Sequence, residues 1–387
     1  MHRLTATSQR TLHGDGQRRW LVASLMVASL LLAACGGGQG ERVAQEPTTS
    51  ATSATPTDAD TTPADADTDS PAAAFPVTIE HTYGETTIES EPERIVSVGF
   101  NEQDTLLALG VTPVAVRNWF GDKPHATWAW ARDELGDAEP TVLAVGELDM
   151  EQIAAQDPDL IVGIFSGITQ QQYDRLSQIA PVVAQPEDYV DFGVPWQEQT
   201  RILGRATGRQ DRAETLISEL ESRFESVRQK HPQFQGATGM VGFLGGGNAN
   251  YHLYGPQDLR ARFMGALGFD IPHDVAQFVG DEFSAPVSRE RLSLTDVDAM
   301  VWVVNDPAGR EQLADEDLYQ NLDVAQQGRD VFLEPNGRLA GALSFSTVLS
   351  LPYALDRLVP RLEAAVDGDP ATEVPSAAPE PTASPSS

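Results

Sequence analysis

The feature that most limits how this chain can fold is the distribution of its large apolar residues. From Gly36 to Ala74 the chain has no Leu, Ile, Phe, Tyr or Trp, and Thr, Ala, Asp, Pro and Ser dominate. Such a segment cannot bury enough apolar surface to offset the entropy of ordering the chain. Residues 367–387 have the same character. We therefore expect a folded part over residues 75–366, between a disordered tether (35–74) and a disordered tail (367–387).

The N-terminus carries a short apolar run behind basic residues. Arg18 and Arg19 precede a run of apolar or small residues from Trp20 to Ala34. The run is shorter than the roughly 20 residues of a membrane-spanning helix, and its basic start and small-residue end are typical of a secretory signal. We assign residues 1–34 to a signal peptide. The two arginines leave the export route open between the general secretory and twin-arginine pathways.

Cys35 is the only cysteine of the chain, so no disulfide can form within it. The ending Leu32-Ala-Ala-Cys35 resembles the lipobox of bacterial lipoproteins, where the peptide is cut before the cysteine and its sulfur takes a diacylglycerol. The resemblance implies a lipid anchor at Cys35 on the extracytoplasmic face of the cell membrane, and two acyl chains anchor a protein stably. The alternative is an ordinary signal peptide that happens to end near a cysteine.

The chain is strongly acidic, with 26 Lys and Arg against 57 Asp and Glu and a formal net charge of −31. This balance argues against nucleic-acid binding, which needs a basic face, and against docking to anionic lipid through a polybasic patch. The motifs G-x-S-x-G, H-E-x-x-H and the P-loop are absent, and the histidines show no ligand spacing. We expect no enzyme, no cofactor and no direct metal site; a hydrolase using Ser166 or Ser344 is the weakest alternative.

Short apolar runs alternate with amphipathic stretches throughout the folded part. A period-2 pattern over residues 77–88, broken at Gly84, predicts a β-hairpin. Buried strands are predicted at 94–98, 113–116, 160–164, 240–244, 299–304 and 330–333, and helices at 102–109, 150–156, 259–267 and 351–366. Alternating strands and helices predict an α/β fold.

One long amphipathic helix is predicted near the middle of the folded part. Leu216, Leu220, Phe224 and Val227 recur at helical spacing, and charged residues occupy the opposite face. We expect this helix (209–231) to be rigid and to join an N-terminal lobe (75–208) to a C-terminal lobe (232–366). Each lobe is predicted to be Rossmann-like with a mostly parallel sheet, and the cleft between two such lobes is the usual place for a small ligand.

The two halves share a local repeat. Glu151 precedes Asp157 by six residues and Asp159 by eight, just before an apolar strand, and Glu290 has the same spacing to two aspartates before another strand. The repeat favours two related lobes. Chance similarity of helix–strand units is the alternative.

Several segments resemble one known family, in the family's order. Glu93–Val98, Leu106–Ala115, Met150–Val162 and Ser346–Asp356 resemble the iron–siderophore and cobalamin class of ABC-transporter substrate-binding proteins, and Trp119–Gly136 is similar to its actinobacterial iron–siderophore branch. The resemblance covers residues 75–366. It implies a monomer with a rigid connecting helix that captures a ferric siderophore and delivers it to an ABC permease dimer with its ATPase.

Candidate ligand-binding residues lie after predicted strands, where open α/β sheets bind ligands, or in the aromatic stretch that begins at Trp119. Flat aromatic faces and a few polar groups suit a large rigid chelate, whereas packing within a lobe is the alternative for each tryptophan. The candidates are Phe100, Asn101, Arg117, Trp119, Phe120, Trp128, Trp130, Phe165, Ser166, Tyr251, Tyr254, Asn305 and Arg338.

Arg117 and Arg338 are the only basic residues that we expect near the cleft. Because ferric catecholates are trianions that need several convergent cations, we favour a neutral or weakly anionic chelate such as a ferric hydroxamate. Cobalamin or haem is an alternative ligand, and His252 or Tyr254 would serve as an axial ligand of haem. A surface adhesin or signalling module with a protein partner is the alternative of another class.

Glu151 and Glu290 are candidate docking residues. The resemblance implies that each lobe offers one of these carboxylates to arginines of the two-fold permease, and two equivalent acids suit a partner with two equivalent basic pockets. The alternative is that each acid only begins a helix, where the helix dipole favours it.

Overall fold

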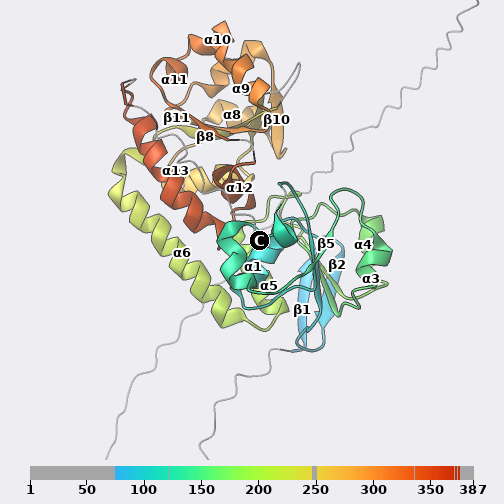
Figure 1. Ribbon diagram of the computed structural model, residues 1–387. Coiled ribbons are helices and arrows are strands. Elements are labelled where there is room, and N and C mark those ends of the chain that lie inside the picture. The colour runs from blue at the N-terminus through green and yellow to red at the C-terminus, as the bar shows by residue number, and fades with distance from the viewer. Residues whose placement is uncertain are drawn as a thin grey trace, which may run out of the picture. The chain divides into compact units, whose positions relative to one another are not determined.

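The computed structural model describes residues 75–121, 123–245, 251–334, 336–369, 371–372 and 374. The predicted signal peptide, Cys35, the tether and most of the predicted tail lie outside the described residues. The described residues belong to one compact unit and build two α/β lobes (Figure 1). Within these residues, no helix has the length and apolar character needed to cross a membrane.

The first lobe is built on a parallel sheet with the strand order β5-β4-β3-β6-β7. The predicted hairpin is present as β1 (Val77–His81) and β2 (Gly84–Ile88), which pair antiparallel. The sheet strands are β3 (Ile95–Ser97), β4 (Ala115–Arg117), β5 (Thr141–Leu143), β6 (Leu160–Gly163) and β7 (Val182–Ala184). The helices are α1 (Glu102–Ala108), η1 (Pro124–Ala126), η2 (Ala129–Ala131), α2 (Arg132–Leu135), α3 (Met150–Ala154), α4 (Gln170–Leu176) and α5 (Trp196–Ala206).

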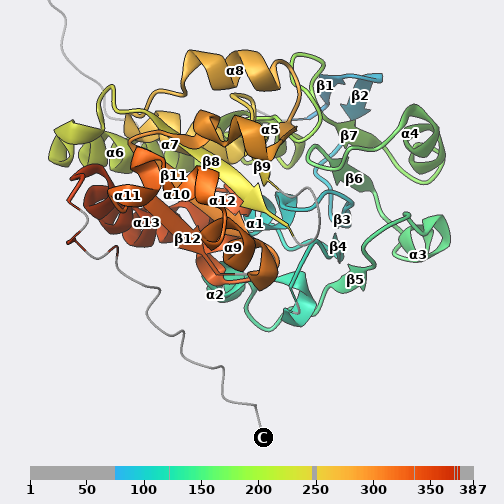
Figure 2. The same cartoon turned by 90° about the horizontal axis from the view of Figure 1, so that it is seen from above.

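Helices cover both faces of this sheet. Alternate residues of a strand point to opposite faces, so Ile95 of β3 packs in one core with α1 and α5, while Val96 packs in another with α3 and α4. Figure 2 shows α3 and α4 together beyond the strands, on the side away from α1. Burial on both faces of the sheet explains why every residue of β3 and β6 is buried and why both strands are rich in apolar residues.

The second lobe has a mixed sheet with the strand order β10-β9-β8-β11-β12. Parallel pairing joins β8 (Gly239–Leu244), β11 (Ala299–Val304) and β12 (Asp330–Leu333), all three of which were predicted. The antiparallel strands β9 (Tyr251–Tyr254) and β10 (Ser284–Val287) were not predicted. The helices are η3 (Pro232–Phe234), α7 (Leu259–Leu267), α8 (His273–Val279), η4 (Arg289–Thr295), α9 (Pro307–Ala314), α10 (Asp317–Gln320), α11 (Asp323–Gln326), α12 (Arg338–Phe345) and α13 (Ser350–Val366).

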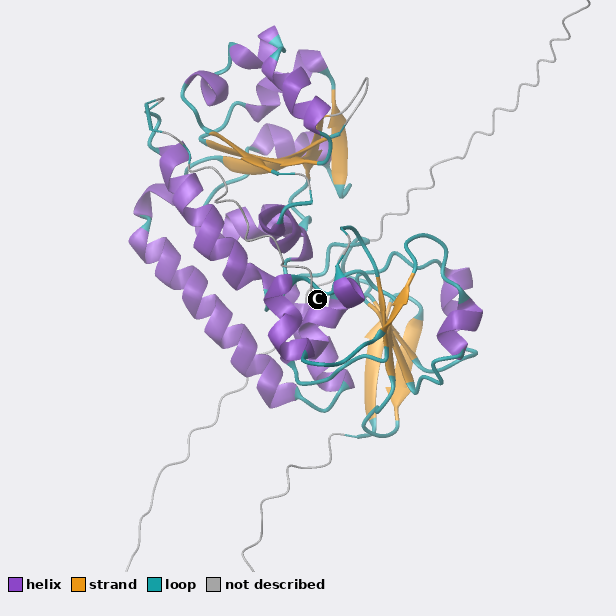
Figure 3. Ribbon diagram, in the orientation of Figure 1, coloured by secondary structure: helices purple, strands orange, loops and turns teal. Residues whose placement is uncertain are grey.

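The predicted long helix is α6 (Gln210–Lys230), and Pro232 follows its end. Its apolar stripe buries Ile217, Leu220 and Phe224. The helix packs against α5 of the first lobe and against α7 and α13 of the second, and Figure 3 shows it beside α13. The predicted fold class, two α/β lobes with mostly parallel sheets, is therefore confirmed.

Candidate functional site

A cavity of about 490 Å³ is lined by residues of both lobes. We call it the cleft cavity. Phe100 follows β3, Trp119 follows β4, Phe165 follows β6 and Asn305 follows β11. These positions lie beyond the carboxyl ends of parallel strands, where open α/β sheets bind ligands. Its volume falls in the range of about 300–1,000 Å³ that is typical of small-molecule sites.

The first lobe contributes a continuous aromatic wall to the cleft cavity. The ring centroid of Trp119 lies 5.7 Å from that of Phe100, 4.9 Å from that of Phe120 and 5.7 Å from that of Phe165. Aromatic rings at these separations make favourable tilted and edge-to-face contacts. The wall is therefore a packed surface that presents flat apolar faces to a ligand.

Phe192 extends this wall across to the second lobe. Its ring lies 5.1 Å from that of Phe165 and 6.1 Å from that of Phe283, which lines the cavity from the opposite side. Phe192 has a φ of 63°, and a Cβ at Gly167 would come within 2.6 Å of its ring. The segment between β7 and α5 thus depends on a glycine at position 167 to place Phe192 at the cavity.

Among the described residues that line the cleft cavity, Arg260 alone carries a charge. Its Nη1 donates to Asp258 Oδ2 over 2.8 Å, its Nε lies 3.4 Å from Ser344 Oγ, and its guanidinium stands 4.3 Å from the centre of the Tyr254 ring. Burial lowers the pKa of Arg260, but attraction to Asp258 and Tyr254 outweighs it and the net pKa is raised. The site therefore holds a cation that already has a buried counter-charge.

Arg260 was not predicted from the sequence, although Tyr254, whose ring it contacts, was. Arg260 lies in the first turn of α7 (Leu259–Leu267), and Asp258 caps that helix by accepting from the Arg260 backbone N–H at 2.8 Å. The signal in the sequence was Asp258-x-Arg260 at a helix start, which resembles any helix N-terminus. The other lining residues that were not predicted are Val145, Phe192, Phe243, Phe283, Val303, Asn336, Ala340 and Ser344.

Six of the predicted residues line the cleft cavity: Phe100, Trp119, Phe120, Phe165, Tyr254 and Asn305. The remaining predicted residues have other places. Asn101 Nδ2 donates to Phe345 O at 2.9 Å, which links the two lobes, and Ser166 Oγ donates to Gly163 O at 2.5 Å. Both side chains are buried and used in holding the backbone.

Arg117 lies directly behind the aromatic wall. Its guanidinium stands 4.2 Å from the centre of the Phe100 ring, and it donates to Val98 O at 3.3 Å and to Gly146 O at 2.5 Å. Burial lowers the pKa of Arg117, and the charge of Glu102 opposes that shift. Arg117 is therefore placed to support Phe100, and it does not line the cavity.

Trp128 and Trp130 lie in the contact between the lobes and do not line the cleft cavity. Their rings stack at 4.8 Å with an interplanar angle of 7°, and Trp128 is only 1% exposed. The Trp128 ring packs against α12 at Gly341, where a Cβ would come within 2.6 Å of it. For these two residues the geometry agrees with the packing alternative.

Tyr251 and Tyr254 point to opposite faces of β9 because they are three residues apart in a strand. Tyr254 lines the cavity, whereas Tyr251 is buried in the core behind the sheet with its ring 6.5 Å from Trp302. Arg338 begins α12 and is half-buried outside the lining of the cleft cavity.

In the described ranges no group of three His, Cys, Asp or Glu side chains is arranged to hold a metal ion.

Glu151 and Glu290 are exposed and lie in equivalent places of the two lobes. Glu151 is in the first turn of α3 and Glu290 in that of η4. The repeated aspartates also correspond: Asp159 accepts from the Glu93 N–H at 2.7 Å just before β3, and Asp298 accepts from the Thr238 N–H at 2.8 Å just before β8. Since β6 pairs with β3 and β11 with β8, each aspartate fixes the strand next to its own.

A model of the periplasmic binding protein family matches residues 95–336, more than half of the chain. The chain belongs to the periplasmic binding protein family. The sequence resemblance to substrate-binding proteins is thereby confirmed, and the family is one of binding proteins.

Three similar proteins show how far this relationship extends. A crystal structure of a periplasmic solute binding protein from Mycobacterium smegmatis is 33% identical with a TM-score of 0.66, covering 75% of this chain and 98% of that one. The ferric enterobactin-binding periplasmic protein FepB of Escherichia coli is 28% identical, over 58% of this chain and 75% of its own. The probable siderophore-binding lipoprotein YfiY of Bacillus subtilis is 28% identical, over 58% of this chain and 67% of its own.

Proposed function

We propose that this chain is the solute-binding lipoprotein of an ABC importer, that it captures a ferric siderophore in the cleft cavity, and that it is not an enzyme. The observation that carries the proposal is the aromatic wall around Trp119 in a cavity of about 490 Å³ between the lobes. Flat aromatic faces with a few polar groups suit a large rigid chelate. The names of FepB and YfiY, which refer to ferric enterobactin and to siderophores, support the same ligand class.

The charge of the cavity favours a neutral or weakly anionic chelate, such as a ferric hydroxamate. Arg260 is the single charged residue in the described lining, and Asp258 already supplies its counter-charge. A trianionic ferric catecholate calls for several convergent cations, and a net-neutral ion pair offers little attraction to it.

Haem is a weaker candidate because the raised pKa of Tyr254 keeps its hydroxyl protonated. A tyrosine that ligates haem iron does so best as the phenolate. Burial raises the pKa of Tyr254, and the opposing attraction of Arg260 does not reverse that shift. His252, the other residue considered for haem, does not line the cleft cavity.

Titration of the purified chain with ferric siderophores tests the proposal. We expect a ferric hydroxamate to bind with a dissociation constant on the order of 10 nM and to quench tryptophan fluorescence, because Trp119 would contact the ligand. The Trp119→Phe variant should lose most of the quenching. If no ferric hydroxamate, catecholate or carboxylate chelate binds more tightly than about 10 µM, the proposal fails.

We further propose that Cys35 carries the lipid anchor and that the protein acts as a monomer, with lobes at residues 75–208 and 232–366. The lipoprotein YfiY supports an anchored location on the extracytoplasmic face. The permease dimer with its ATPase would receive the ligand through Glu151 and Glu290, which lie at equivalent exposed places. Replacement of Cys35 tests the first assignment, and charge reversal of the two glutamates tests the second.

A further inference from the structure

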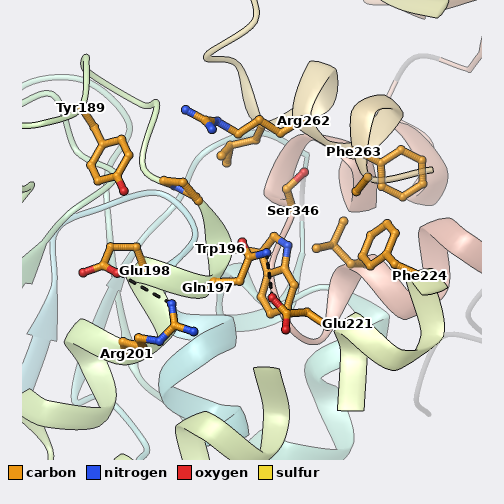
Figure 4. A pocket seen from close by; sticks show the side chains of 14 residues that line it. Tyr189, Trp196, Gln197, Glu198, Arg201, Glu221, Phe224, Arg262, Phe263 and Ser346 are labelled. Carbon is orange, nitrogen blue, oxygen red and sulfur yellow. Dashed lines mark hydrogen bonds and ion pairs between the residues drawn. The ribbon is translucent and has the colours of Figure 1, made fainter. Parts of the chain in front are cut away.

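A second cavity, of about 480 Å³, lies among α5, α6 and α7 (Figure 4). We call it the helix cavity. It shares no described lining residue with the cleft cavity. The segment before α5 separates the two: Phe192 lines the cleft cavity, whereas Tyr189 and Pro195 line the helix cavity. An occupant of the helix cavity would contact a helix of each lobe and the helix that joins them.

Aromatic side chains form much of the wall of the helix cavity. Trp196 comes from α5, Phe224 from α6 and Phe263 from α7, and Tyr189 stands on the opposite side in Figure 4. The rings of Phe224 and Phe263 meet edge to face with centroids 5.7 Å apart. These surfaces suit the faces and edges of a flat ring.

Arg262 brings a cation without a close counter-charge to this apolar wall. The side chain is half-buried, and its Nε donates to the backbone oxygen of Gln257 at 3.2 Å. Among the described residues, no carboxylate lies within 4.0 Å of its guanidinium. Burial lowers the pKa of Arg262, and attraction from Tyr189 and Asp258 only partly offsets it. A guanidinium stays protonated in proteins, so this is a partly desolvated charge.

The other charged residues at the helix cavity are already engaged. Arg201 pairs with Glu214 at 3.0 Å and with Glu198 at 3.9 Å. Glu221 accepts from Gln197 Nε2 at 3.3 Å, and Figure 4 places it on the side of the cavity opposite Arg262. An incoming carboxylate would therefore find its best partner at Arg262, and a ligand with a second negative charge would approach Glu221 or Glu198.

We propose that the helix cavity is a second binding site, which takes a small planar organic monoanion of the aromatic carboxylate class. Its carboxylate would accept paired hydrogen bonds from the Arg262 guanidinium, the geometry in which arginine binds carboxylates most strongly. Its ring would lie against Trp196 and Tyr189, which both line the helix cavity and are partly exposed. Such a ligand supplies the counter-charge that the described residues do not.

Calorimetric titration of the purified full chain with 2-naphthoate and with its neutral analogue 2-naphthamide tests this proposal. We expect 2-naphthoate to bind once per chain, with a dissociation constant on the order of 0.1 mM. The neutral amide should bind about tenfold more weakly, because a charge-assisted hydrogen-bond pair is replaced by neutral ones. This comparison uses the unaltered protein and so does not depend on the folding of a variant.

Three variants locate the bound probe. Arg262→Gln should lower the affinity for 2-naphthoate about tenfold. The matched change Arg201→Gln removes a charge from the same cavity that is already paired, and should weaken binding by less than about threefold. Trp119→Ala, in the cleft cavity, should have no effect. Equal binding of the acid and the amide would overturn the proposal, as would unchanged binding by Arg262→Gln or loss of binding by Trp119→Ala.

Discussion

Asp104 of α1 accepts a hydrogen bond over 2.8 Å from the hydroxyl of Thr347, which lies in the other lobe between α12 and α13. Trp130 Nε1 donates to the same oxygen, Asp104 Oδ2, over 2.6 Å. The carboxyl is buried, and its Oδ1 has no hydrogen-bond partner among the described residues. Burial raises the pKa of Asp104 to about 7, although both hydrogen bonds act in the opposite direction. A titratable group thus stands in the contact between the lobes.

The raised pKa of Asp104 makes the stability of the lobe contact depend on pH. The folded state holds the proton up to about pH 7, whereas the unfolded chain releases it near pH 4. The free energy of unfolding therefore falls as the pH rises from 4 to 7, by up to roughly 4 kcal/mol from this group, and levels off above pH 7. Asp104→Asn resembles the protonated form and should lose this dependence.

Denaturant unfolding of both proteins at several pH values measures this effect. The stability of Asp104→Asn relative to the wild type should increase steadily between pH 4 and 7. Asp281→Asn, which removes the carboxylate of an exposed acid, is the matched control and should not reproduce the change seen with Asp104→Asn. A pH-independent difference for Asp104→Asn would show that Asp104 does not titrate in this range.

The sequence predicted the parallel strands well because their signal is local. Val162 of β6 and Val301 of β11 lie in apolar runs buried on both faces of a sheet, and such runs are read directly from composition. Strand β9 was missed because Tyr-His-Leu-Tyr carries no such run and gains its place from antiparallel pairing with β8 and β10. Pairing partners distant in the sequence leave no local pattern.

The tryptophan-rich stretch shows why the site could be predicted only in part. Trp119 lines the cleft cavity and Trp128 is buried, yet both follow the same strand and have the same chemistry. The difference comes from Gly341, more than 200 residues later, which leaves room for the Trp128 ring on α12. Arg260 was missed for a related reason: only the folded chain shows that the first turn of α7 faces the cavity.

These two tryptophans should therefore respond differently to replacement. Trp119→Ala should lower the affinity for a ferric siderophore by about tenfold to a hundredfold, because an aromatic contact with the ligand is lost. The free energy of unfolding should change little. Trp128→Ala should lower the free energy of unfolding by about 3–5 kcal/mol, because a buried ring is removed from a close-packed contact. Calorimetric titration and denaturant unfolding of both variants separate the two effects. If the two variants lost the same affinity and the same stability, the placement of Trp119 in the cleft cavity and of Trp128 in the lobe contact would be contradicted.

Removing the counter-charge of Arg260 should change which chelates bind. Asp258→Asn keeps an oxygen that can cap α7 but leaves Arg260 as an uncompensated cation in the cleft cavity. We expect the affinity for anionic ferric chelates to rise by about tenfold relative to neutral ones, in a competition titration. The double variant Asp258→Asn with Arg260→Gln should return the ratio to near the wild-type value. If Asp258→Asn left the ratio of anionic to neutral chelate affinity unchanged, the charge of Arg260 would not contribute to ligand binding.

The lipid anchor that we propose at Cys35 predicts where the protein is found in the cell. Processing before Cys35 and acylation of its sulfur should keep the mature chain with membranes, since two acyl chains anchor a protein stably. Cys35→Ser should release the chain or leave the signal peptide attached. Membrane fractionation with mass spectrometry of the N-terminus measures both outcomes. Membrane association of Cys35→Ser with cleavage at the same place would show that the cysteine is not lipidated.

The docking role that we propose for Glu151 and Glu290 makes a prediction about uptake. Hydrogen bonds from its own backbone N–H and from Ser288 lower the pKa of Glu290, so it is ionised at neutral pH. Both acids are exposed and do not line the cleft cavity, so their replacement should leave siderophore affinity unchanged. In the double variant Glu151→Arg with Glu290→Arg, the new arginines would repel the arginines expected on the permease. This variant should reduce uptake by at least about tenfold.

Uptake of a radioactive ferric siderophore by cells, alongside binding to the purified variants, tests this docking. The matched control Glu219→Arg with Glu311→Arg reverses two exposed acids on α6 and α9 and changes the net charge equally. It should import at the wild-type rate, which separates the docking contacts from the general effect of charge. The effect of the single variants should shrink at high salt, because exposed charges are screened. Wild-type uptake by the double variant Glu151→Arg with Glu290→Arg would show that these acids only begin their helices.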